Sequence, residues 1–136
     1  ADNLEEAIRH YQLALEVMTR RKMPVEWATT TMNLANAYLN RIRGDRAKNI
    51  EQAIHHYQQA LEVYTRQAFP QDWAMAQNNL ANAYSDRIRG ERAENIERAI
   101  QAYQAALEVM TREAMPVEWA QTMNNLATAY RNRIRG

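Results

Sequence analysis

The chain has 136 residues, of which 24% are charged, with a formal net charge of +1 and no cysteine. This charge balance argues against a protein dedicated to nucleic acid or membrane surfaces, and the missing cysteine excludes disulfides and thiolate metal sites. Three glycines and three prolines among abundant Ala, Leu, Glu, Gln and Arg predict an all-α fold. No apolar run approaches the roughly 18 residues of a membrane span, and no signal peptide opens the chain. We therefore expect a cytoplasmic protein without a membrane partner.

The first third of the sequence predicts two helices, over residues 3–22 and 24–43. Asn3 would cap the first of them, with Glu6 three residues on as in a capping box. Pro24 suits the first position of the second helix, because the N–H at that position has no partner inside the helix.

The remaining helices follow the same alternation along the chain. They are expected near 48–68, 70–89, 94–114 and 116–135. Asn49 and Asn95 would cap the third and the fifth of the six helices, and a proline opens the fourth and the sixth. Turns this short predict antiparallel neighbours, and each hairpin buries its apolar stripe only against the next hairpin.

The tetrapeptide RIRG occurs three times in the chain, after the second, the fourth and the sixth predicted helix begins, and it is a candidate basic site. Its arginines are Arg41, Arg43, Arg87, Arg89, Arg133 and Arg135. In the last turn of a helix they would complement the helix dipole, and the glycine after them would be the left-handed residue that ends the helix. Stacked units would align the arginines into a ridge, so binding of an acidic protein or RNA through this ridge is an alternative function, although the charge balance leads us to expect a protein partner and no nucleic acid.

Glycine, proline and tryptophan all recur with a period of 46 residues. The glycines, for example, are Gly44, Gly90 and Gly136. A period of roughly 20 to 50 residues is typical of solenoid arrays. We therefore predict that residues 1–136 form a single α-solenoid domain. Its repeat units run approximately over 3–48, 49–94 and 95–136.

A family pattern emerges when the second helix of one period is read together with the first helix of the next. In that order the matching residues are Leu80, Ala81, Tyr84, Ala99, Tyr103 and Ala106. The chain thus resembles a tetratricopeptide (TPR) array, in a long form similar to the kinesin light chain repeats and to arrays of filamentous bacteria. The resemblance implies a right-handed superhelix that acts as a protein–protein interaction scaffold.

The resemblance also implies a groove, lined by the second helix of each period, in which asparagines bind the backbone of an extended peptide. An asparagine amide both donates and accepts hydrogen bonds, which suits a peptide bond. The candidate groove residues are Asn33, Asn36, Met75, Asn78, Asn79, Asn82, Gln121, Asn124, Asn125 and Thr128. Bonding between helices and plain solvated surface are the alternatives for these asparagines. Positions that vary between units, such as Leu39, Asn40 and Arg131, would select the bound sequence.

Nothing in the sequence points to catalysis, a cofactor or a metal ion. His10, His55 and His56 have no counterpart in the third period, and adjacent histidines on a helix point about 100° apart. We expect the histidines at the surface, and the three tryptophans packed between successive helices rather than stacked on a ligand. The second function class is self-association, because near-identical units could stack head to tail between chains.

Overall fold

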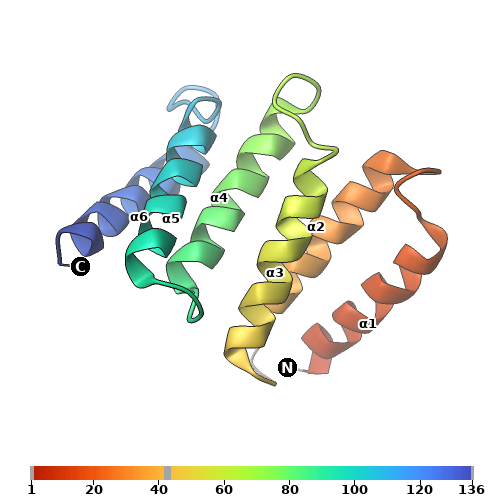
Figure 1. The fold of residues 1–136 in the computed structure, drawn as a ribbon. Coiled ribbons are helices and arrows are strands. Elements are labelled where there is room, and N and C mark those ends of the chain that lie inside the picture. Colours follow the sequence, from red (N-terminus) through yellow and green to blue (C-terminus); the bar gives the residue numbers. More distant parts are fainter. Residues whose placement is uncertain (1, 42–43, 136) are drawn as a thin grey trace. The chain divides into compact units, whose positions relative to one another are not determined.

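The computed structural model of the protein describes residues 2–41 and 44–135 (Figure 1). The helices are α1 (Asp2–Val17), α2 (Pro24–Asn40), α3 (Arg46–Leu61), α4 (Pro70–Asp86), α5 (Arg92–Leu107) and α6 (Pro116–Arg135). The described residues form these six helices and no strand, which confirms the predicted all-α helical-repeat fold. None of the described helices is long and apolar enough to cross a membrane, and the cytoplasmic location stays a prediction.

The chain divides into two compact units, Ala1–Thr65 and Arg66–Gly136. In the first unit α2 packs against α1 and against α3, and in the second unit α5 packs against α4 and against α6. In the second unit α4 also contacts α6. Each unit therefore contains the predicted antiparallel hairpins, with consecutive helices as neighbours.

Each unit has a core built from small and medium apolar side chains. In the first unit Ile8, Leu34 and Ala37 form a buried cluster beneath larger, half-buried residues of α1 and α2. In the second unit Ala74 and Ala106 are fully buried beside Met110. Alanine at these positions allows neighbouring helix backbones to approach closely, so a repeated alanine sets the spacing of the hairpins.

The helices α3 and α5 begin earlier than the sequence predicted. The carboxylate of Asp45 caps α3 by accepting hydrogen bonds from the backbone N–H groups of Ala47 and Lys48. Asn49 lies inside α3, and Asn95 lies inside α5, where both are buried. The prediction that these asparagines are N-caps is therefore wrong, because the N-caps are Asp45 and Glu91, four residues earlier. The predicted Asn3 cap is also wrong, since α1 begins at Asp2.

The even-numbered helices begin as predicted, and α2 and α4 end earlier than predicted. Pro24 and Pro70 occupy the first turns of α2 and α4, which confirms the expected role of proline. Arg41 and Arg87 follow the helix ends in extended conformation, so the prediction that they lie in a last helical turn is wrong. The loss of the last turn leaves these two side chains available for other contacts.

Gly44 and Gly90 adopt the predicted left-handed conformation, with φ of 82° and 81°. Their place in the chain differs from the prediction. Gly90 precedes Glu91, the N-cap of α5, and Gly44 precedes Asp45, the N-cap of α3. The glycines therefore turn the chain into the next helix, and they do not end the previous one.

Candidate functional site

The predicted asparagines of α4 and α6 lie close together in the second unit. Asn125 on α6 donates a hydrogen bond from Nδ2 to Oδ1 of Asn82 on α4, at 3.4 Å. One turn earlier, the hydroxyl of Thr122 on α6 donates to Oδ1 of Asn78 on α4, at 2.9 Å. The two helices therefore present one polar face, which we call the amide face. Its residues are Asn78, Asn79, Asn82, Gln121, Asn124, Asn125 and Thr128.

A buried tyrosine holds the asparagine at the centre of this face. The Tyr103 hydroxyl donates a 2.6 Å hydrogen bond to Oδ1 of Asn82. The first unit repeats the arrangement, with the Tyr57 hydroxyl donating to Oδ1 of Asn36. Both tyrosine side chains are almost fully buried, and burial raises the pKa of each phenol. The phenols thus stay protonated and keep donating, so Asn36 and Asn82 take part in bonding between helices.

These contacts leave the amide nitrogens of two asparagines for other partners. Oδ1 of Asn82 accepts from both Tyr103 and Asn125, which uses its two lone pairs. The described part of the chain gives no partner to Nδ2 of Asn82 or to Nδ2 of Asn78. Each of these half-buried side chains therefore turns its oxygen toward the fold and keeps two N–H donors.

The other predicted groove residues fall into different environments. Gln121, Asn124 and Thr128 on α6 are exposed, and the Thr128 hydroxyl donates to the backbone oxygen of Asn124 at 3.1 Å. Met75 is half-buried against the apolar cluster that contains Ala74, so it contributes to the core. Asn33 on α2 and Asn79 on α4 are also half-buried. All the residues of the amide face are uncharged.

The arginines of the RIRG segments make specific contacts within their own unit. Arg41 forms two hydrogen bonds with the carboxylate of Glu5, of 2.8 and 2.6 Å, which raise the pKa of the guanidinium. Arg133 forms an ion pair with Glu97 at 2.7 Å. Arg43 and the side chain of Arg135 lie outside the described residues. The described contacts attach α2 to α1 and α6 to α5, which gives these arginines a structural role.

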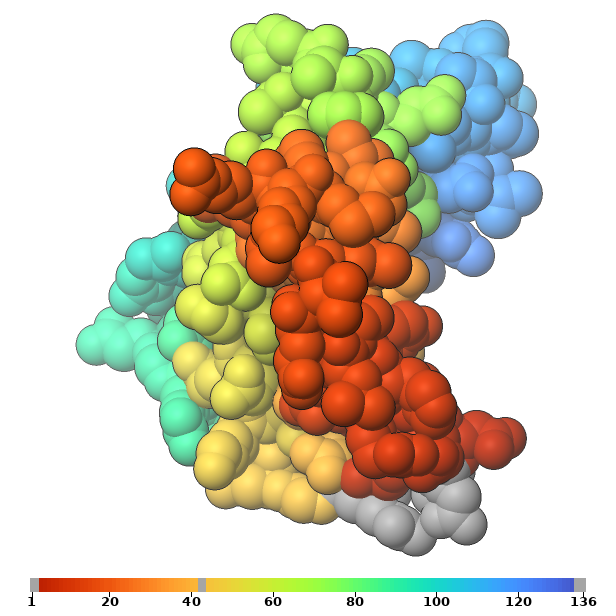
Figure 2. Space-filling view, turned by 90° about the vertical axis from the view of Figure 1, so that its right-hand side faces the viewer, coloured from red at the N-terminus to blue at the C-terminus, as the bar shows by residue number. Residues whose placement is uncertain are grey.

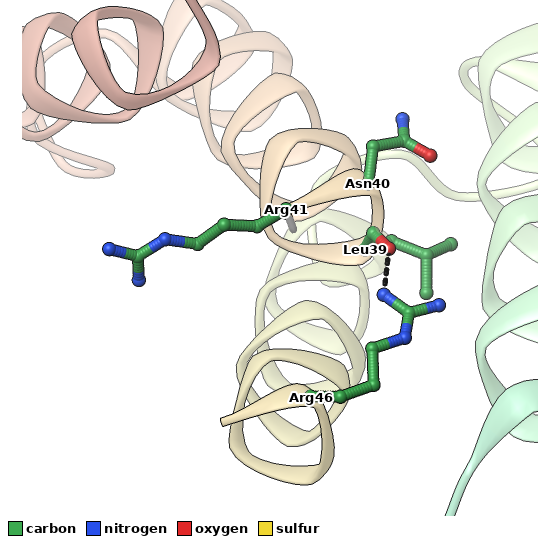
Figure 3. Close-up of a pocket in the computed structure, with 4 residues that line it drawn as sticks. All are labelled: Leu39, Asn40, Arg41 and Arg46. Carbon is green, nitrogen blue, oxygen red and sulfur yellow. Dashed lines mark hydrogen bonds between the residues drawn. The ribbon is translucent and has the colours of Figure 1, made fainter. Parts of the chain in front are cut away.

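A shallow pocket of about 400 Å³ lies where α2 ends, lined by Leu39, Asn40, Arg41 and Arg46 (Figure 3). Arg46 donates a hydrogen bond to the backbone oxygen of Leu39, whereas the side chain of Arg41 points to the other side of the helix. The two guanidinium groups therefore do not converge on a single ligand in this pocket.

A buried asparagine fixes the second RIRG segment. Asn95 on α5 is 4% exposed, and its Nδ2 donates a 2.9 Å hydrogen bond to the backbone oxygen of Arg89. Its Oδ1 accepts a 3.3 Å bond from Arg87. The sequence did not predict this contact, because an asparagine that follows a turn also fits the pattern of a helix cap.

Loop arginines missed by the sequence analysis cover two of the tryptophans. The guanidinium of Arg20 lies 5.7 Å from the ring centroid of Trp27, and that of Arg66 lies 5.6 Å from Trp73. The same arginines form ion pairs with the glutamates that end α3 and α5, Glu62 and Glu108. Trp73 also packs against the buried cluster of Ala74, as predicted for a structural tryptophan. The one signal in the sequence was that both the arginines and the glutamates recur with the period.

The histidines lie in different environments and do not come together as metal ligands. His56 on α3 is half-buried and stacks on Tyr38 of α2, with ring centroids 5.7 Å apart, and burial lowers its pKa. His10 and His55 are exposed, as predicted. Across residues 2–41 and 44–135, no three side chains of histidine, aspartate or glutamate are placed to hold a metal ion.

Comparison with protein families gave a match within the second unit. Residues 73–109, which include most of α4 and all of α5, match the tetratricopeptide repeat. Comparison with curated proteins and with solved structures gave no significant match. The matched segment contains Asn82 of the amide face and the buried Tyr103, whose hydroxyl donates a hydrogen bond to Asn82. This match and the six-helix repeat together fit a TPR-like repeat array.

Proposed function

We propose that the chain is a protein-interaction scaffold that binds an extended segment of a partner protein on the amide face. Repeats of this family are typically scaffolds without catalytic activity, and we assign the chain no reaction. The observation that carries the proposal is the orientation of Asn78 and Asn82, whose N–H donors are not used by the described part of the fold. An extended backbone supplies the carbonyl oxygens that such donors require.

The chemistry of the amide face defines what its ligand should be. Uncharged amides give no electrostatic steering, so binding should depend little on salt. Gln121 and Asn124 are exposed beside Asn125 and would extend the contact along α6. In the first unit, Asn33 and Asn36 on α2 are the corresponding candidates. The proposed ligand is therefore an uncharged, extended peptide whose main chain makes most of the hydrogen bonds.

The test uses substitutions that keep the internal contacts and remove only the donors. In Asn82→Asp a side-chain oxygen still accepts the hydrogen bond from Tyr103, and in Asn78→Asp one still accepts the hydrogen bond from Thr122. In both variants the side-chain N–H groups are lost. Peptides selected by display against the wild type should bind each variant at least about tenfold more weakly, which is the loss expected for one or two hydrogen bonds.

The matched control is Gln101→Glu, which adds the same charge on the exposed surface of α5. This variant should bind the selected peptides as the wild type does. Equal affinity of the wild type, Asn78→Asp and Asn82→Asp would contradict a peptide site on the amide face.

We propose as a second function that the chain associates with itself. The observation that favours it is the exposure of an apolar face on α6, where Met123 is 42% and Tyr130 is 37% exposed. Light scattering over a range of protein concentrations tests this proposal, and a mass that stays that of one chain throughout would contradict it.

A further inference from the structure

The last turn of α4 continues the amide face with groups of opposite hydrogen-bonding character. Ser85 and Asp86 are exposed, and they follow Asn82 by three and four residues, which places them on the same side of the helix. Asn78 and Asn82 keep N–H donors on this side, whereas the ionised carboxylate of Asp86 only accepts hydrogen bonds. From Asn78 to Asp86 the helix therefore presents two donors followed by a negative charge.

The buried tyrosine that holds Asn82 lies beside both of these residues. The Ser85 hydroxyl lies 3.5 Å from the hydroxyl of Tyr103, which donates to Asn82. Burial is the main cause that raises the pKa of Tyr103, and the negative charge of Asp86 raises this pKa further. A carboxylate close enough to act on this phenol is also close to the asparagine that the phenol holds. Asn82, Ser85 and Asp86 thus surround the hydroxyl of Tyr103.

The negative charge of Asp86 is unfavourable for the helix that carries it. Asp86 is the last residue of α4, where the negative end of the helix dipole disfavours an acidic side chain. The corresponding residues are Asn132 in α6 and Asn40, the last residue of α2 in the first unit, whose α1 is red in Figure 2. A neutral asparagine therefore fits this position of the repeat, and the charge is a feature of α4 alone among the three helices.

The spacing of these side chains matches the repeat of an extended peptide. Asn78, Asn82 and Asp86 follow one another at intervals of four residues, which places them about 6 Å apart along the helix axis. In an extended chain, carbonyl groups on the same side recur every second residue, at about 6.7 Å. Two such carbonyl oxygens can therefore accept from Asn78 and Asn82, and the next step along the peptide reaches Asp86.

From this row of side chains we infer that the extended peptide on the amide face carries a basic side chain, lysine or arginine, that pairs with Asp86. This basic residue lies about two residues beyond the carbonyl that Asn82 binds. Asp86 also interacts with another residue of the chain, but a carboxylate has about four acceptor sites and can take a second partner. The inference rests on the proposed function and specifies its ligand: the segment on the amide face is uncharged, and one positive charge lies next to it.

The first experiment compares matched peptides. Peptides selected by display against the wild type should share a lysine or arginine at one fixed position. Replacement of this residue by glutamine should weaken binding to the wild type by about three- to fivefold, as expected for a partly exposed ion pair. Asp86→Asn should lose the same factor with the basic peptide, and it should bind the basic and the neutral peptide equally well.

Two controls separate this contact from a change in the fold or in the total charge. Asp86→Asn should keep the helix content of the wild type, because asparagine occupies the corresponding positions in α2 and α6. Asp72→Asn removes the same charge from the exposed first turn of α4, about 21 Å away along the helix axis. This second variant should bind both peptides as the wild type does.

Salt and charge reversal give two further readouts that a purely structural role of Asp86 would not change. The preference of the wild type for the basic peptide should shrink as the ionic strength rises, whereas its affinity for the neutral peptide should stay constant. Asp86→Lys should prefer a peptide with glutamate at the fixed position to the basic peptide, because the charges are exchanged. An Asp86→Lys variant that still prefers the basic peptide would overturn the pairing.

The outcomes separate the inference from the proposal on which it rests. Asn78→Asp and Asn82→Asp are measured with the neutral peptide, because their added charge would otherwise attract the basic side chain. If both variants bind this peptide as the wild type does, the peptide site and the inference are both overturned. If they bind it more weakly, but Asp86→Asn keeps the preference for the basic peptide or the selected peptides share no basic residue, only the pairing with Asp86 is overturned.

Discussion

The hydroxyl of Tyr103 lies 2.6 Å from Oδ1 of Asn82 and joins the buried face of α5 to the amide face on α4. A core residue thereby sets the orientation of an amide at the candidate binding surface. The same pairing of Tyr57 with Asn36 in the first unit shows that it belongs to the repeat. Bonding between helices, which the sequence left as an alternative for these asparagines, therefore occurs at this repeat position. Binding of a ligand by the remaining N–H groups stays a prediction.

We predict that Tyr103→Phe lowers the free energy of unfolding by about 1 kcal/mol, because it removes one buried hydrogen bond and keeps the ring. Urea unfolding followed by circular dichroism measures this loss. Tyr130→Phe is the control: Tyr130 is partly exposed and accepts a hydrogen bond from Gln104, so its change should stay within about 0.5 kcal/mol. Equal losses in the two variants would contradict a special role for the buried phenol.

We predict that Asn95→Ala costs about 1–3 kcal/mol of unfolding free energy, since the backbone oxygen of Arg89 loses its donor. The partner Arg87 also loses an acceptor. Asn124→Ala provides the matched control, because the Asn124 side chain is exposed and makes no hydrogen bond among the described residues. Thermal unfolding of both variants measures the difference, and an unchanged melting temperature for Asn95→Ala would refute the stabilising role of these bonds.

Replacement of Gly90 by alanine should cost about 1–2 kcal/mol, because φ is 81° and an L-residue is strained there. The nearest atoms to an added Cβ are 3.7 Å away, at an ordinary contact distance, so the cost comes from the backbone alone. Gly90→Asn should cost less, since asparagine tolerates the left-handed region better. Denaturation midpoints measure the stability of the three proteins. We expect the wild type to have the highest midpoint, Gly90→Asn an intermediate one and Gly90→Ala the lowest.

Acidification should destabilise the first unit through His56. Burial lowers the pKa of His56 below its usual 6.5 in the folded chain, and the neighbouring His55 lowers it further. The unfolded chain therefore takes up this proton first as the pH falls. The free energy of unfolding should be unaffected by His56 above about pH 6.5 and should decrease below that value.

His56→Ala is the control for this effect, because alanine occupies the same repeat position in α5, at Ala102. The variant keeps His10 and His55, so their contributions remain in both proteins. Unfolding measured between about pH 8 and about pH 5, which brackets the usual histidine pKa, should show a smaller loss for the variant. Parallel pH profiles of the two proteins would show that the pKa of His56 is not lowered.

The sequence predicted the number and order of the helices because their apolar periodicity and their prolines are local signals. The predicted ends of α1, α3 and α5, at residues 22, 68 and 114, were wrong, since these helices end at Val17, Leu61 and Leu107. The boundary of α3 was wrong because Asp45 and Asn49 are both good capping residues, and periodicity does not choose between them. The bonds of Asn82 and Asn95 could not be predicted from spacing. The partner of Asn82 lies on another helix, so this bond depends on how the helices cross, and the bonds of Asn95 depend on the path of the preceding turn.

The pairing of Arg20 with Glu62 and of Arg66 with Glu108 has a consequence for how such a chain can lengthen. In each pair the glutamate follows its arginine by the same interval of the sequence. Duplication or deletion of one whole period preserves that interval wherever the breakpoints fall. A gain or loss of any other length inside a period would move a glutamate away from its arginine and uncover a tryptophan. The ion pairs thus favour growth of the gene by complete repeats.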